Sequence, residues 1–304
     1  MLTACGVTPQ LPDLTRLYRD QVTISEPERR PVIAIPGLLG SRLVHQPSDR
    51  LAWGATGLSL DPDDPEEARI LSLPISTGDE PLTALIDDVR PDGIFHGADA
   101  SRFIVPVEID VYRGLLKTLN NGGYDYRLTR RAELEREYNA GSFEFPYDWR
   151  RDIVEGARVL DDFIRRKAAQ VRGVRAQRYG AFPAEVKFDI VAHSMGTLVT
   201  KYYLMYGGQD LPEDGSLPEL TWEGARHVGF VVLVAPPFHG SITAFENLVN
   251  GKSFSPITRD YPAALLGTFP SVYQLMPRAR HGRVRDAGGG PIENLYDPDL
   301  WETK

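Results

Sequence analysis

Short apolar segments recur along the chain and are separated by longer amphipathic ones. β-Branched and aromatic residues dominate residues 31–36, 143–149, 186–192 and 228–235, which predicts four strands. Helical spacing of apolar residues predicts helices around 111–119 and 157–171, and an almost wholly apolar helix at 195–206, as expected beneath the centre of a sheet. Because strands alternate with helices, the chain is predicted to form an α/β fold with parallel crossovers.

Residues 41–100 do not follow this alternation. They are rich in proline, aspartate and glycine and are too long for an ordinary βα connection. We therefore expect a polar N-terminal tail at 1–29, a core at 30–241 that carries a lid-like insertion at about 41–100, and a separate segment at 242–304.

The segment Ala192-His193-Ser194-Met195-Gly196 joins a predicted strand directly to a predicted helix. This is the setting of a nucleophile elbow, in which a sharp turn exposes a serine hydroxyl between small residues. The motif predicts Ser194 as a catalytic nucleophile. A structural serine in a tight turn is the alternative.

A second turn, Pro36-Gly37-Leu38-Leu39-Gly40, follows the first predicted strand. Acyl transfer to serine needs two backbone N–H groups that converge on the developing oxyanion. We expect Met195, directly after the nucleophile, to supply one and Leu38 the other. Alternatively, the glycines serve only the turn, since glycine tolerates positive φ.

Four motifs together resemble one known family. Pro36–Gly40, Phe145-Pro146-Tyr147-Asp148-Trp149-Arg150, Ala192–Gly196 and Ala235-Pro236-Pro237-Phe238-His239-Gly240-Ser241 occur in the order found in the lecithin:cholesterol acyltransferase family. The resemblance runs from about Arg30 to the C-terminus. It implies an α/β-hydrolase fold, a mostly parallel sheet with helices on both faces plus lid and cap segments, and an acyl-enzyme at Ser194.

The same resemblance suggests roles for other residues. It implies a lid tryptophan near the acyl site, which suggests Trp53, although a core anchor is an equal alternative. It also implies that 242–304 is part of a cap. Asp148 and Arg150 end the strand predicted at 143–149, where they would form a buried ion pair or contact the cap or a polar substrate group.

No histidine of the sequence is an evident catalytic base. A base must accept the serine proton and be oriented by a carboxylate, and in this fold it follows the serine along the chain. Only His227, His239 and His281 do so. His227 precedes a predicted strand, and no carboxylate that could orient His281 ends a recognisable strand. His239 follows the strand at 228–235, but the family resemblance implies that its turn is structural, and His193 adjoins the nucleophile on the elbow. The family resemblance places the acid and the base after two further core strands. We therefore expect those strands to be missing, and the strand at 228–235 to lie at an uncovered edge.

Composition limits the class of protein. Among 304 residues, 34 are basic and 42 acidic, giving a net charge of −8, which argues against nucleic acid as a partner. No apolar run is long enough to span a membrane. No cluster has metal-ligand spacing, and we expect neither metal nor cofactor.

The single cysteine, Cys5, lies in Leu2-Thr3-Ala4-Cys5-Gly6, which is typical of a bacterial lipoprotein cleavage site. The rest of a signal peptide would have to precede it. A lipid anchor in the cell envelope, or secretion, is thus one expectation, and an ordinary tail on a cytoplasmic protein is the other.

The favoured function is a serine-dependent lipase, phospholipase or O-acyltransferase of lipid metabolism, acting on an acyl ester or phospholipid. A soluble carboxylesterase and a non-catalytic remnant of the hydrolase fold are the alternatives.

Overall fold

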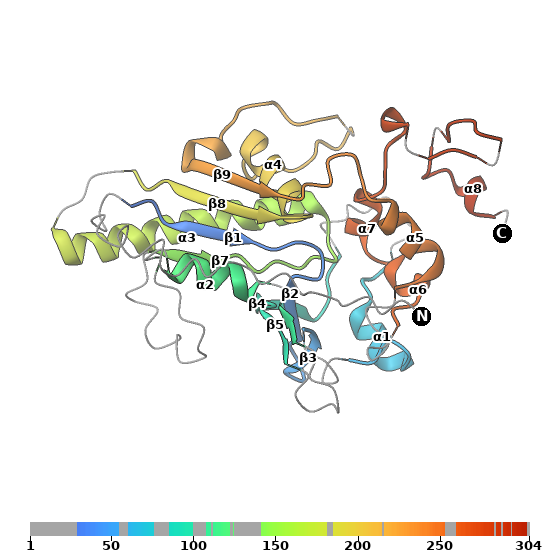
Figure 1. Cartoon of the computed structure of the whole chain (residues 1–304), viewed down its shortest axis with the longest axis horizontal. Coiled ribbons are helices and arrows are strands. Elements are labelled where there is room, and N and C mark those ends of the chain that lie inside the picture. Colours follow the sequence, from blue (N-terminus) through green and yellow to red (C-terminus); the bar gives the residue numbers. More distant parts are fainter. Residues whose placement is uncertain are drawn as a thin grey trace, which may run out of the picture.

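A parallel β-sheet forms the centre of the computed structural model (Figure 1). The structure describes residues 29–54, 60–75, 85–99, 108–110, 112–121, 124, 141–180, 185–214, 216–252, 260–282, 284–286, 288–292 and 294–302. Residues 1–28 of the predicted N-terminal tail, which contain Cys5, lie outside these residues.

The central sheet has the order β7-β1-β8-β9, and each neighbouring pair is parallel. Its strands are β1 (Val32–Ile35), β7 (Ser142–Glu144), β8 (Phe188–His193) and β9 (Val228–Val234). All four predicted strands are present. The strand predicted at 143–149 extends too far. After Glu144 the chain leaves the sheet, and the side chains of Tyr147 and Trp149 donate hydrogen bonds to the turn at 36–41.

Helices cover both faces of the sheet. They are α2 (Arg113–Asn121), α3 (Ile153–Tyr179) and α4 (Gly196–Tyr206). Alternate residues of β1 point to opposite faces: Ile33 and Ile35 share a core with α3 and α4, whereas Ala34 packs with Tyr112 and with Leu116 of α2. The predicted α/β architecture is confirmed.

The insertion at 41–100 has regular structure of its own. Strands β2 (Ser41–His45), β3 (Arg50–Trp53) and β4 (Val89–Ile94) form an antiparallel sheet, and α1 (Pro65–Leu71) lies between β3 and β4 along the chain. Beyond them β5 (Gly97–Asp99) pairs with β6 (Glu108–Asp110). In Figure 1 β2, β3, β4 and β5 lie on the side of the central sheet that carries β7, and α1 lies farther along, below α6.

The segment after β9 is helical. It contains α5 (Ile242–Asn250), α6 (Ala263–Leu266), α7 (Pro270–Gln274), α8 (Pro298–Glu302) and the short 3-10 helix η7 (Ala279–His281). Figure 1 shows α5, α6 and α7 beyond the carboxyl ends of the central strands. An edge-to-face contact of 5.7 Å between the rings of Trp149 and Phe269 joins this segment to the core.

Strand β9 forms an edge of the central sheet, and its side chains are exposed. The 3-10 helix η6 (Gly224–His227) leads into it. Phe230 is 60% exposed, and Val232, Leu233 and Val234 are also exposed. This agrees with the expected uncovered edge. Sheets usually protect such edges with charge, proline or a covering element, and within the described residues β9 has none of these on its free side.

Among the helices that the structure describes, none is long and apolar enough to cross a membrane.

Candidate active site

Ser194 lies on the two-residue turn, Ser194 and Met195, between β8 and the N-terminal end of α4. Its φ is +50°, a left-handed conformation that is uncommon for residues other than glycine. The backbone N–H of Ser194 donates to the carbonyl oxygen of Val234 on β9 at 2.9 Å, so the last pairing of the sheet fixes the turn. The structure therefore places Ser194 at the carboxyl edge of the sheet in a strained backbone, a feature that gathers at functional sites.

Two glycines allow the turn after β1 to approach Ser194. A Cβ atom on Gly196 would lie 2.3 Å from the carbonyl oxygen of Pro36, and one on Gly37 would lie 2.7 Å from the Cβ of Ser194. Neither position can hold a larger residue without movement of the backbone. These contacts give the small residues of both motifs a physical reason, and they bring the two turns together as expected.

Residues that follow β7 hold the turn after β1 in place. The Tyr147 hydroxyl donates to the carbonyl oxygen of Pro36 at 3.0 Å. The Tyr147 backbone N–H donates to the Ser41 hydroxyl at 3.1 Å, and the Trp149 indole N–H donates to the Ser41 carbonyl at 3.0 Å. Tyr147 and Trp149 are almost fully buried. The motif at 145–150 thus supports the turn.

Tyr112, which the sequence did not single out, also holds this turn. Its hydroxyl oxygen accepts the backbone N–H of Gly37 at 2.7 Å and lies 2.9 Å from Nδ1 of His193. Its ring packs edge-to-face on the His193 ring. Burial raises the pKa of Tyr112 and lowers the pKa of His193, so both groups are favoured in their neutral forms. Because Gly37 and Tyr112 are 75 positions apart, no local pattern could reveal this contact.

The amides of Leu38 and Met195 were predicted to bind an oxyanion. Met195 is fully buried at the start of α4. In the part of the chain that the structure describes, neither backbone N–H has a hydrogen-bond acceptor. The two amides lie one on each of the two turns that meet at Ser194, and their role as oxyanion donors stays a prediction.

Trp53 is half-buried at the end of β3. Its indole N–H donates to the carbonyl oxygen of Leu39 at 2.8 Å, and its ring lies edge-to-face on Trp149 and Tyr261, at 5.8 and 5.5 Å. These contacts favour a role for Trp53 as a core anchor over a role as a lid residue near the acyl site. Trp53 joins the insertion to the turn beside Ser194.

Arg150 is fully buried and forms ion pairs with Asp148 and Asp87. Its guanidinium donates twice to Asp148, at 3.0 and 2.6 Å, and once to the carbonyl oxygen of Leu71 at 2.8 Å. Burial raises the pKa of Asp87, and the charge of Arg150 opposes this shift. The geometry favours the structural ion pair over a contact with substrate, since all these partners belong to the protein.

No histidine reaches the nucleophile in the observed arrangement. Across the described residues, which include all six histidines, none has a hydrogen bond to the Ser194 hydroxyl. His227 precedes β9 and so lies at the opposite end of the sheet from Ser194, about 20 Å away for a strand of this length. His239 and His281 pack edge-to-face at 4.9 Å beyond the end of β9.

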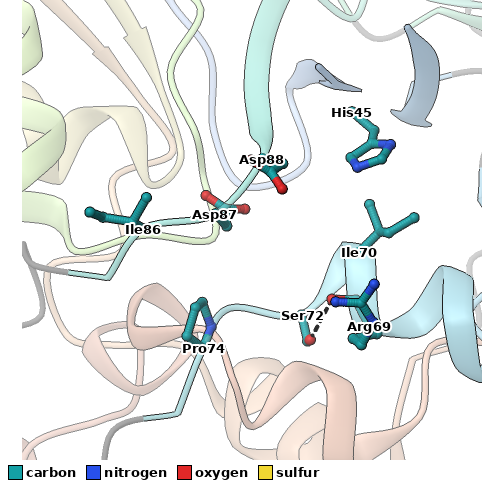
Figure 2. A pocket seen from close by; sticks show the side chains of 8 residues that line it. All are labelled: His45, Arg69, Ile70, Ser72, Pro74, Ile86, Asp87 and Asp88. Atoms are coloured by element: carbon teal, nitrogen blue, oxygen red, sulfur yellow. Dashed lines mark hydrogen bonds between the residues drawn. The ribbon is translucent and has the colours of Figure 1, made fainter. Parts of the chain in front are cut away.

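A pocket of about 330 Å³ lies elsewhere, between α1 and the residues that precede β4 (Figure 2). Its lining residues are His45, Arg69, Ile70, Ser72, Pro74, Ile86, Asp87 and Asp88. None of them belongs to the two turns at Ser194, so this pocket is not the space in front of the nucleophile. Asp87 lines the pocket and also forms an ion pair with Arg150.

No group of three or more histidine, cysteine, aspartate or glutamate side chains in the described residues is arranged to hold a metal ion.

Part of the chain matches the model of a known protein family. The model of the family described as lecithin:cholesterol acyltransferase matches residues 110–287, which contain Tyr112, the residues after β7 and the Ser194 turn. No curated protein matches the sequence significantly.

Among solved structures, one of the Tle4–Tli4 complex is similar, with a TM-score of 0.55 and 16% sequence identity. The similarity covers 90% of this chain and 62% of that chain. At such low identity the likeness shows the fold alone. With the parallel sheet and its flanking helices, it identifies the fold as the α/β-hydrolase type.

Proposed function

The chain belongs to the lecithin:cholesterol acyltransferase family, and we propose that it acts on lipid acyl esters through a covalent acyl-enzyme at Ser194. Membership supports a lipid acyl-ester hydrolase or acyltransferase at the level of the family. The observation that carries the assignment to Ser194 is its position on the β8–α4 turn, with a φ of +50° and with Gly37 and Gly196 packed against it.

In the proposed reaction, the Ser194 oxygen attacks the acyl carbonyl carbon while its proton passes to a base. The carbonyl oxygen becomes an oxyanion, which the N–H groups of Leu38 and Met195 stabilise. Loss of one such donor typically costs about 10²- to 10³-fold in rate. The C–O bond to the alcohol then breaks, the alcohol leaves with a proton, and the acyl group stays on Ser194.

A second half-reaction frees the enzyme. Water or an alcohol attacks the acyl-serine, giving a free fatty acid or a new ester. The two outcomes share one intermediate. We propose no base among the observed side chains, because none contacts the Ser194 hydroxyl in the described residues. Should the 304-residue protein turn over by itself, His239 and His281 are the candidates, since both follow β9 at the carboxyl end of the sheet.

The test replaces the nucleophile and a control serine. Ser194→Ala should abolish the release of fatty acid and the formation of new ester from phospholipid vesicles that contain a long-chain alcohol. Ser271→Ala is the matched control, because Ser271 is fully buried and its hydroxyl has no partner among the described residues. The ratio of fatty acid to new ester tells hydrolase from transferase. Activity retained in Ser194→Ala would refute the assignment.

Two other functions remain testable in the same assay. The lack of a histidine contact to Ser194 favours a protein that binds acyl lipids without turning them over. Such a protein would bind phospholipid vesicles equally well with serine or alanine at 194 and would release no product. A soluble carboxylesterase would hydrolyse short-chain esters and leave phospholipid unchanged.

Lipid attachment at Cys5 is part of the proposal for membrane association, and this residue lies outside the described residues. The mass of the N-terminal peptide, isolated from the native host, tests it. A diacylglyceryl group on Cys5 supports an envelope lipoprotein, and an unmodified Cys5 contradicts one.

A further inference from the structure

A single peptide group beside Ser194 is held from both ends by buried tyrosines. The peptide between Pro36 and Gly37 presents its carbonyl oxygen to the Tyr147 hydroxyl at 3.0 Å and its N–H to the Tyr112 hydroxyl at 2.7 Å. Tyr147 is 3% exposed and Tyr112 is 5% exposed, so water does not compete for either bond. The orientation of this peptide plane is thus fixed, and the next N–H along the chain is that of Leu38.

The Tyr112 hydroxyl has one proton, and the hydrogen bonds around it show which atom accepts this proton. Its oxygen accepts the Gly37 N–H, which leaves the hydroxyl proton to be donated. Nδ1 of His193, at 2.9 Å, is the acceptor that the described residues offer. A buried hydroxyl normally satisfies its donor, so Nδ1 of His193 accepts and the ring carries its proton on Nε2. Tyr112 therefore connects the turn after β1 to the residue that precedes the nucleophile.

We propose that Tyr112 is a positioning residue for acyl transfer: through its hydroxyl it locks both the Pro36–Gly37 peptide and the Nε2–H tautomer of His193, which keeps the Leu38 amide directed at the oxyanion. The proposal rests on the proposed function of Ser194. Tyr112 itself does not touch the reacting atoms. The Gly37 amide, being engaged by Tyr112, is not an oxyanion donor.

The packing of Tyr112 allows its hydroxyl to be removed without emptying the core. Its ring contacts Gly40, where an added Cβ would lie 2.9 Å from the ring, and it packs with Ala34 and Leu116. Phenylalanine preserves these contacts. Tyr112→Phe should thus leave the fold intact and remove only the two hydrogen bonds.

Two variants complete the design. Tyr147→Phe removes the bond at the other end of the same peptide and leaves His193 untouched. Tyr203→Phe is the control, because Tyr203 is fully buried and its hydroxyl has no partner among the described residues. Each variant is compared with the wild type for thermal unfolding, for the ¹⁵N imidazole shifts of His193, for amide exchange at Gly37, and for the rate at which a fluorophosphonate modifies Ser194.

Wild type should show His193 as the Nε2–H tautomer. Tyr112→Phe should produce a mixture of tautomers, at least tenfold faster exchange of the Gly37 amide, and about tenfold slower modification at saturating probe, as expected when an oxyanion donor is loosened rather than removed. Tyr147→Phe should slow modification but leave the His193 tautomer unchanged. Tyr203→Phe should match the wild type in the His193 tautomer, in the exchange of the Gly37 amide and in the rate of modification.

An unchanged tautomer and unchanged Gly37 exchange in Tyr112→Phe would overturn the proposal. The NMR and exchange measurements need no turnover, so they separate this proposal from the function of Ser194. If Ser194 in the wild type is never modified, the proposed function fails. The positioning role of Tyr112 in acyl transfer then fails with it, whatever the NMR spectra show.

Discussion

Replacing Gly196 by alanine should both destabilise the protein and disable the site. The added Cβ would lie 2.3 Å from the Pro36 carbonyl oxygen, which is 0.7 Å inside the 3.0 Å that real Cβ contacts respect. It would also lie 2.9 Å from Cγ2 and 3.0 Å from the carbonyl oxygen of Ile35, so a small shift of the alanine cannot relieve the overlap. The turn after β1 must move away from β8.

The cost follows from the bonds that this movement disturbs. Overpacking of a core costs about 1–3 kcal/mol. Weakening the bond from Tyr147 to Pro36 adds about 1 kcal/mol. We therefore expect Gly196→Ala to lose about 2–4 kcal/mol of unfolding free energy, and its Ser194 to be modified by a fluorophosphonate at least about tenfold more slowly, because the oxyanion amides are displaced.

Gly173→Ala is the control for this measurement. Gly173 lies on the exposed side of α3, and an added Cβ there meets nothing within 4 Å. Alanine should raise the unfolding free energy by about 0.5–1 kcal/mol, since glycine is a poor helix former. Urea denaturation measures both variants. Gly196→Ala within 0.5 kcal/mol of the wild type, with Gly173→Ala behaving as expected, would show that the two turns are not packed as described.

Three further outcomes follow from the structure. Arg150→Met should destabilise the protein by about 3–5 kcal/mol in urea denaturation, because Asp148 and Asp87 lose their shared buried cation; a loss below 1 kcal/mol would contradict the buried network. Burial lowers the pKa of His193 from 6.5, so below pH 6.5 the unfolded chain binds a proton that the folded protein does not, and the unfolding free energy falls as the pH falls. His193→Gln should make the unfolding free energy less dependent on pH in this range, and an equal dependence in variant and wild type would contradict this. Because Phe230 is exposed on an edge strand, we expect the protein to self-associate in sedimentation velocity and Phe230→Lys to associate less; equal association of the two would contradict this.

The sequence predicted the elements whose patterns are local. β8 and α4 were located to within two residues, because an apolar strand, small residues and a buried helix follow one another directly. The apolar run of β9 likewise predicted its strand, whereas its exposure at an edge was expected from the family resemblance, which places further core strands after it. In contrast, the length of the strand at 143–149 was overestimated. Phe145, Tyr147 and Trp149 have strand-like side chains, but Tyr147 and Trp149 bind the turn at 36–41.

The parts of the site that the sequence did not reveal depend on distant contacts. Tyr112 lies in a segment with no motif, and its role exists only because α2 covers the face of the sheet that also carries His193. Trp53 was left between two roles, and its bond to the Leu39 carbonyl could not be read from a local pattern. The antiparallel sheet of the insertion was likewise hidden by its short strands and frequent prolines, aspartates and glycines.

The most direct test of the account is the site of covalent modification. The 304-residue protein is incubated with an alkyl fluorophosphonate, and the intact mass and the modified peptide are determined by mass spectrometry. We predict a single adduct on Ser194 that is absent from Ser194→Ala and present in Ser271→Ala. No adduct, or an adduct that persists in Ser194→Ala, would contradict the claim that Ser194 is the nucleophile.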